Sequence, residues 1–166
     1  MSMIKEKMAD ALNSQMNAEF YSAYLYQAMS AFFESQNLKG FANWMQVQAK
    51  EEWSHGMKFY KFIIERGGEV KLDALSAPPQ KWNSPLAVFE DSYAHEQKVT
   101  GLIHSLVSLS RAQEDYATES FLKWFIDEQV EEEANASEIL AKLKLIKDNT
   151  NGIFMVDHEL GKRKRD

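Results

Sequence analysis

The residues that break helices are confined to one short stretch of this chain. All three prolines lie between Pro78 and Pro85, and the only Gly-Gly pair, Gly67-Gly68, lies just upstream of them. Proline and glycine interrupt or end helices, so the sequence on either side of this stretch is free to form long ones. We therefore expect an all-α protein.

Apolar residues recur at intervals of three and four on both sides of the break, which is the period of an amphipathic helix. Ser84-Pro85 is a typical helix start, because serine caps the helix and proline suits its first position. We expect one domain spanning residues 1–166, with helices at about 4–33, 38–66, 85–112, 115–147 and 150–160, a crossover at 67–84 and a charged, frayed tail at 162–166.

The connections predict how these helices pack. Gln36-Asn37 leaves room only for a short turn, so the first two helices are expected to be antiparallel neighbours. The segment before the third helix is too long for a turn, and a crossover along the bundle would make helices two and three parallel. Leu72, Leu75 and Trp82 are expected to hold it in place. The expected fold is a four-helix bundle with a long crossover and a short C-terminal fifth helix.

Composition narrows the chemistry further. None of the 166 residues is cysteine, which excludes a disulfide framework, a thiolate zinc site and a cysteine-ligated iron–sulfur cluster. The uncharged run from Phe20 to Phe33 is too short to span a bilayer, and the N-terminus has no apolar signal core. A net charge of −6 disfavours nucleic acid and is compatible with cations as partners. We expect a cytoplasmic protein with no nucleic-acid or membrane partner.

Every long helix carries ionisable residues inside its apolar stripe. They are Glu19 in the first, Glu52 and His55 in the second, Glu96 in the third, and Glu128 and Glu132 in the fourth. Taken singly, each acid is better explained by a solvated helix face, and the histidine by ordinary core packing. Taken together, at matching depth on four helices, they favour a metal site.

The chemistry of such a site follows from its donors. Glu52 and His55 are three residues apart, so they share one helix face, where a carboxylate and an imidazole can bind one metal ion. Several buried carboxylates cannot all stay ionised without cations, and two divalent ions would neutralise four of them. Oxygen and imidazole ligands suit iron, manganese or zinc.

These residues lie within longer motifs. The motifs are Asn17-Ala18-Glu19-Phe20-Tyr21-Ser22-Ala23-Tyr24-Leu25-Tyr26, Glu51-Glu52-Trp53-Ser54-His55, Glu65-Arg66-Gly67-Gly68, Glu96 and Glu128-Gln129-Val130-Glu131-Glu132-Glu133. Through them the chain resembles the prokaryotic non-haem ferritins over nearly its whole length. The resemblance implies a ferritin-like bundle with a di-iron ferroxidase centre inside each subunit.

The resemblance also assigns roles to individual residues. It implies that Glu19, Glu52 and His55 hold one iron. It implies that Glu96 and Glu132 hold the second, with Glu52 bridging the two.

Further residues would surround this centre. The resemblance implies that Gln129 lies close to the second iron, that Tyr26 is a tyrosine beside the centre, and that Trp124 lies near it. A third, inward-facing iron site would be formed by Glu51, Glu128, Glu131 and Glu132.

Two positions depart from related ligand sets. The residue three after Glu132 is Asn135, so the second Glu-x-x-His pair of bacterioferritins and many di-iron oxygenases is absent. We expect a looser second iron site that passes oxidised iron onward. Trp53 follows Glu52 at the place where bacterioferritins have a haem-ligating methionine, so no haem is expected.

The resemblance implies an iron-storage function. Such a protein oxidises Fe(II) with O2 or H2O2 and deposits hydrated ferric oxide inside a homo-oligomeric shell, usually of 24 subunits, with the fifth helix at a symmetry axis. Tyr24, Phe32 and Trp82 are explained equally well as subunit contacts or as ordinary packing.

Three other classes stay open at this point. A di-iron oxidoreductase or peroxidase of the rubrerythrin type would keep two irons and use an electron donor. A DNA-protecting, miniferritin-like assembly would use Lys162 to Arg165 as a DNA-binding tail, which the net charge of −6 opposes. A metal-free bundle of cytokine-like topology would turn the acids of the stripes to solvent.

Overall fold

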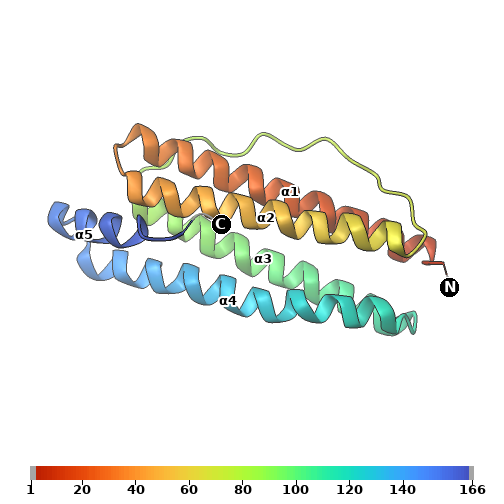
Figure 1. The fold of residues 1–166 in the computed structure, drawn as a ribbon. Coiled ribbons are helices and arrows are strands. Elements are labelled where there is room, and N and C mark those ends of the chain that lie inside the picture. Colours follow the sequence, from red (N-terminus) through yellow and green to blue (C-terminus); the bar gives the residue numbers. More distant parts are fainter. Residues whose placement is uncertain (1–2, 165–166) are drawn as a thin grey trace.

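The computed structural model describes residues 3–164, which form five α-helices and no β-strand (Figure 1). The helices are α1 (Glu6–Ser35), α2 (Lys39–Glu65), α3 (Pro85–Ala112), α4 (Tyr116–Ile146) and α5 (Thr150–Leu160). The predicted fold class, an all-α four-helix bundle with a long crossover and a short fifth helix, is confirmed. No helix within this range is long and apolar enough to cross a membrane.

The bundle consists of two antiparallel hairpins, α1 with α2 and α3 with α4 (Figure 1). Each hairpin turns at a residue with a positive φ angle just beyond the helix end, 59° at Asn37 and 55° at Glu114. α2 also ends at a left-handed residue, Gly67, whose φ is 70°. This conformation ends a helix and redirects the chain within a few residues. The crossover then runs back along α1, so α2 and α3 point the same way (Figure 1).

Two buried asparagines of α1 hold the crossover in place. Asn13 accepts a hydrogen bond from the Lys71 N–H at 2.7 Å, and the Asn17 amide donates to the Lys71 carbonyl at 2.9 Å. Of the three residues expected to do this, Trp82 packs against the core, with its ring 5.6 Å from that of Phe32, as predicted. Leu72 and Leu75 are 69 % and 38 % exposed, so the expectation was wrong for them. There the extended segment is held through its backbone polar groups, which need partners wherever they leave water.

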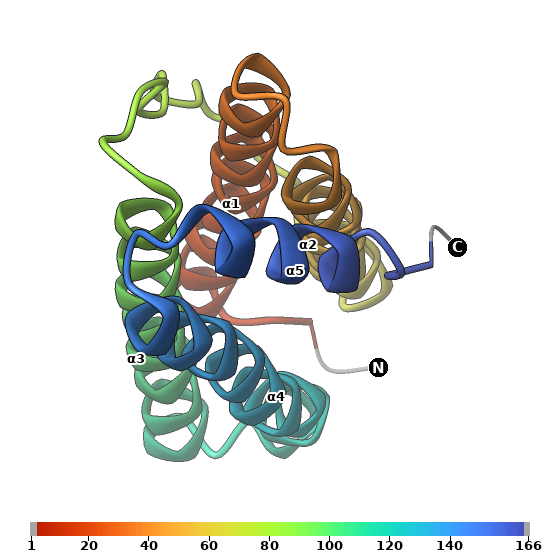
Figure 2. The same cartoon turned by 90° about the vertical axis from the view of Figure 1, so that its left-hand side faces the viewer.

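α5 lies across one end of the bundle, beside the start of α2 (Figure 2). The Asp157 side chain of α5 accepts hydrogen bonds from the backbone N–H groups of Gly40, at 2.8 Å, and Phe41, at 3.0 Å. The N-cap residue of α2, Leu38, provides no side-chain cap. α5 therefore supplies one and places negative charge at the positive end of the α2 dipole. A Cβ atom on Gly40 would lie 1.6 Å from the Asp157 carbonyl oxygen, so this approach requires glycine.

One residue of the segment 162–166, which was expected to fray, is anchored on α2. The Arg163 guanidinium lies over the Trp44 ring, 4.4 Å from its centroid, and the arginine side chain is only 19 % exposed. The Asn43 amide donates to the Arg163 carbonyl oxygen at 2.9 Å. Arg163 is thus engaged with α2 and not extended toward a partner. Arg165 and Asp166, which belong to the predicted tail, lie outside the described residues.

The bundle core is divided into two apolar clusters. One surrounds Phe33, Phe41 and Phe89 at the α5 end, and the other surrounds Phe59 and Phe125 toward the far end. The residues at the helix midpoints between these clusters are polar and buried. They are Glu19, Ser22, Gln48, Glu52, His55, Ser92, Glu96, Gln129 and Glu132. The fold therefore encloses a polar layer between two apolar ones.

Candidate metal centre

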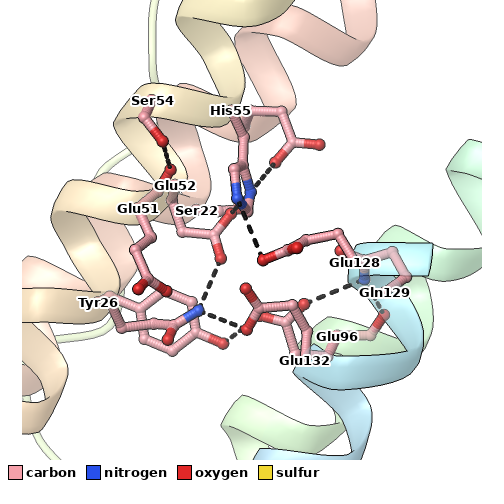
Figure 3. Close-up of polar contacts among 12 residues, drawn as sticks. Ser22, Tyr26, Glu51, Glu52, Ser54, His55, Glu96, Glu128, Gln129 and Glu132 are labelled. Carbon is pink, nitrogen blue, oxygen red and sulfur yellow. Dashed lines mark hydrogen bonds and ion pairs between the residues drawn. The ribbon is translucent and has the colours of Figure 1, made fainter. Parts of the chain in front are cut away.

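Five potential metal ligands converge in this buried layer (Figure 3). Ligand atoms of Glu19, Glu52 and His55 all lie within 4.8 Å of one another, and so do those of Glu52, Glu96 and Glu132. None of the five residues is more than 4 % exposed. Because Glu52 belongs to both groups, the geometry provides two adjacent sites that share one carboxylate.

The helix period brings the α2 pair together. Glu52 and His55 lie on one face of α2, and the His55 Nδ1 atom is 3.3 Å from a Glu52 oxygen and 3.8 Å from a Glu19 oxygen of α1. The Nε2 atom of the same ring is 3.8 Å from a Glu128 oxygen of α4. The imidazole therefore lies between the acids of three helices.

Side-chain amides donate to one oxygen of each of three carboxylates. The Gln15 amide donates to Glu19 at 2.8 Å, and the Gln48 amide donates to both Glu52, at 2.9 Å, and Glu132, at 2.7 Å. Sequence reasoning assigned no role to these two glutamines. Their signal is a repeated spacing, since each lies four residues before a ligand glutamate and hence one helical turn away.

Glu96 is held in the same way by residues of two other helices. The Tyr26 hydroxyl of α1 donates to one Glu96 oxygen, and the Gln129 amide of α4 donates to the other at 3.2 Å. Tyr26 and Gln129 therefore contact the centre through Glu96.

The donor set has capacity left for a cation. The second oxygen of Glu19, Oε2, is buried and makes no hydrogen bond. An unpaired buried carboxylate oxygen is costly unless something positive approaches it. Carboxylate oxygens and an imidazole nitrogen are ligands that iron, manganese and zinc accept, so the residues fit a pair of such ions.

Burial perturbs the titration of these acids. Desolvation raises the pKa of Glu96 from 4.5 to about 7, and raises the pKa of Glu19 above its ordinary value. Desolvation, followed by repulsion from the neighbouring glutamates, raises the pKa values of Glu52 and Glu132 well above the usual range. Without cations the cluster thus retains protons near neutral pH, and a bound divalent ion would displace them.

Comparison with known proteins agrees with this arrangement. A family model described as a ferritin-like domain matches residues 9–146. This chain belongs to the ferritin family. The predicted family is thereby confirmed.

Individual relatives cover almost the whole of this ferritin. It is 44 % identical to a bacterial non-heme ferritin of Bacteroides fragilis over 161 residues, covering 97 % of this chain and 100 % of the relative. A bacterial non-heme ferritin of Staphylococcus aureus is 43 % identical to it, and the alignment covers 97 % of this chain and 97 % of the relative. An open pore ferritin from Archaeoglobus fulgidus has a similar structure, with a TM-score of 0.98 and 52 % identity over 99 % of this chain and 100 % of that one.

The outer acids of this ferritin are arranged less tightly than the central ones. Glu128 was expected to face inward with Gln129 beside it, but Gln129 is 4 % exposed and the Glu128 side chain is 23 % exposed. The position of Glu128 close to His55 nevertheless completes a third group with Glu132, whose ligand atoms also lie within 4.8 Å.

Glu51 and Glu131 do not join such a group among the residues that the structure describes. Glu131 is exposed at the surface of α4. The Glu51 carboxylate is 44 % exposed and accepts a hydrogen bond from the Arg163 guanidinium at 2.8 Å. Of the four residues assigned to a third iron site, Glu128 and Glu132 share a close group with His55, while Glu51 and Glu131 lie near enough to Glu128 that, after desolvation, their charges help to raise its pKa.

Trp124 packs against the edge of the centre. Its ring lies 5.3 Å from the His55 ring in a near-perpendicular arrangement, and Lys58 places its ammonium 3.7 Å from the Trp124 ring centroid. The indole therefore covers one side of the histidine ring.

Proposed function

We propose that this protein is an iron-storage ferritin whose subunit oxidises Fe(II) at the buried centre. The observation that carries the proposal is the pair of three-residue groups that share Glu52 inside one chain. Two ions held so close can give electrons to one oxidant. The names of the full-length relatives support iron as the metal.

Each ligand has a defined part in this proposal. Glu19, Glu52 and His55 hold one Fe(II), and Glu52, Glu96 and Glu132 hold the other. The two Fe(II) ions each give one electron to O2, which takes up two protons and leaves as H2O2, while both irons become Fe(III). Hard carboxylate oxygens favour this change because they bind the higher charge more strongly.

The second iron is held more loosely than the first. Its set contains no histidine, and Asn135, at the position of a second Glu-x-x-His pair, is exposed. Gln129 offers only an amide near Glu96. Oxidised iron leaves on this side, and Glu128, with Glu51 and Glu131 further out, provides carboxylates for its transit.

Storage requires an enclosed space that one bundle cannot provide. We propose that copies of this chain assemble into a hollow shell, of 24 subunits, in which hydrated ferric oxide accumulates. The protein acts in the cytoplasm and uses no haem. The exposed aromatic side chain of Tyr24 on α1, 50 % exposed, is available for a contact between subunits.

An iron-loading experiment tests this function. Purified apo-protein is titrated aerobically with Fe(II), and iron is quantified across the gel-filtration peak. Hundreds of irons per particle of several hundred kilodaltons are expected. Saturation near two irons per chain on a small oligomer would reject storage and favour a di-iron oxidoreductase of the rubrerythrin type.

Two ligand variants test the centre itself. His55→Ala and Glu52→Ala are expected to slow Fe(II) oxidation strongly while particle size stays unchanged. His104→Ala, which alters an exposed histidine of α3, is the matched control and should oxidise iron at the wild-type rate. Wild-type kinetics in His55→Ala or Glu52→Ala would refute the site assignment.

A further inference from the structure

The Arg163 side chain makes polar contacts with three parts of α2. Its guanidinium donates to the Gln48 side-chain oxygen at 2.9 Å, to a Glu51 carboxylate oxygen at 2.8 Å and to the Trp44 carbonyl at 3.2 Å. The side chain is 19 % exposed and stacks on the Trp44 ring. The guanidinium donates to two planar side-chain groups and stacks on an aromatic ring, and together these contacts fix its orientation.

Gln48 connects this arginine to the metal centre. The Gln48 residue is 1 % exposed, and its amide nitrogen donates to Glu52 of α2 at 2.9 Å and to Glu132 of α4 at 2.7 Å. The amide nitrogen of Gln48 therefore donates to two candidate ligands, and its oxygen accepts from Arg163. The chain of bonds joins the C-terminal segment to the shared carboxylate and to a carboxylate of the opposite hairpin.

We propose that Arg163 is a positioning residue for the metal centre, which it orders by fixing the side-chain amide of Gln48. This proposal rests on the proposed function. An amide can turn over and exchange its oxygen and nitrogen. Once a bound cation has displaced the protons of Glu52 and Glu132, the turned Gln48 oxygen would face two carboxylates and the Gln48 N–H groups would face the Arg163 cation, so both ends would be repelled. The Arg163 charge makes that state unfavourable and strengthens the N–H donors by polarising the amide.

Arg163 affects cation binding in two opposite ways. Its positive charge lies near the acids and by itself opposes a divalent cation, so its removal would tighten binding if charge were its only effect. Its hold on Gln48 orients two of the ligands, so its removal would weaken binding if positioning dominates. The sign of the change in affinity therefore separates the two roles.

Anaerobic titration with Co²⁺ provides the test, because Co²⁺ binding is followed by its visible absorption and does not depend on oxidation. Arg163→Met keeps an unbranched stem against Trp44 and removes every donor. We expect Co²⁺ to bind about 10- to 100-fold more weakly, the usual effect of losing a residue that orients a metal ligand. Lys162→Met removes the same charge from the neighbouring exposed residue and should bind no more weakly than the wild type. Equal or tighter binding in Arg163→Met would overturn the proposal.

A second variant tests the connection through Gln48. Gln48→Met should lose affinity by itself, and adding Arg163→Met to it should cost nothing more, because the arginine then has no amide to orient. Wild-type affinity in Gln48→Met would refute the connection even if Arg163→Met did not fold. Losses that add in the double variant would refute it as well. Circular dichroism and gel filtration verify the fold of each variant.

The same titration separates this inference from the proposed function. Wild-type protein should bind two Co²⁺ ions per chain, and His55→Ala should lose at least one of them. If the wild type binds no Co²⁺, the metal centre itself is refuted. If the wild type binds Co²⁺ and Arg163→Met binds it equally well, only the positioning role is refuted.

Discussion

Replacement of Glu96 by glutamine should stabilise the metal-free protein at high pH. Glu96 is 1 % exposed, and desolvation raises its pKa to about 7 from the ordinary value of 4.5. The folded state therefore binds this proton more tightly than the unfolded chain does. The stability that this gives is fully present below pH 4.5 and is lost as pH rises through 7.

The pKa difference sets the magnitude. At pH 8 the ionised carboxyl costs the folded protein about 3 kcal/mol relative to the neutral one. Glutamine avoids this cost, but it offers one acceptor where Glu96 accepts from both Tyr26 and Gln129, which costs about 1 kcal/mol. The net gain of about 2 kcal/mol corresponds to a melting temperature about 6 °C higher for a chain of this length. At pH 5 the advantage should disappear, because Glu96 is then neutral in the wild-type fold.

Calorimetry of chelator-treated protein at pH 5 and pH 8 measures this difference. Glu90→Gln, an exposed change on the same helix, is the control and should show no such pH-dependent gain. Saturating Co²⁺ should reverse the order of stability, since the variant lacks a ligand. A Glu96→Gln protein that is no more stable than the wild type at pH 8 would refute the view that these buried acids repel charge in the apo state.

Three further perturbations have defined outcomes. Co²⁺ binding at pH 6.5 should release protons, because burial raises the pKa values of Glu52 and Glu132 and the bound ion displaces the protons that they hold. A weakly buffered indicator solution measures the release. Binding without proton release would show that both carboxyl groups are already ionised. Gly40→Ala should detach α5 and lower the melting temperature. Gly101→Ala is the control and should be neutral or stabilising, because its Cβ atom would meet nothing within 4 Å. Equal effects of the two substitutions on the melting temperature would refute the docking of α5 through Gly40. Tyr26→Phe should destabilise the apo-protein by about 1 kcal/mol in denaturant titration, because Glu96 loses a buried donor, and an unchanged midpoint would contradict that contact.

Sequence pattern was sufficient for the helices and for the acids and the histidine that converge at their midpoints. Proline and glycine end helices through local backbone geometry, so their clustering between Gly67 and Pro85 located the crossover without knowledge of any partner. The period of 3.6 residues likewise placed Glu52 and His55 on one face. Both inferences depend on residues that lie within one or two turns of each other.

Neighbouring positions on one helix were harder to separate. Each residue rotates the side chain by about 100° around the axis, so Glu128 and Gln129 differ only in where the helix is turned relative to its neighbours. That rotation is set by packing across the whole bundle, and it turned Gln129 inward and left Glu128 at the edge. The outward turn of Glu51 toward Arg163 depends in the same way on where α5 docks.

The sequence by itself thus determined an all-α bundle, its crossover and the residue types that could hold two metal ions, because these follow from short-range periodicity and from side-chain chemistry. Only the tertiary structure decided which groups orient the metal-binding side chains and cap the helices. Gln48 reaches Glu132 across 84 positions, and Asp157 caps α2 from 117 positions away. Such bonds join groups with no regular spacing along the chain, so no local pattern encodes them, and they exist only once the helices have packed.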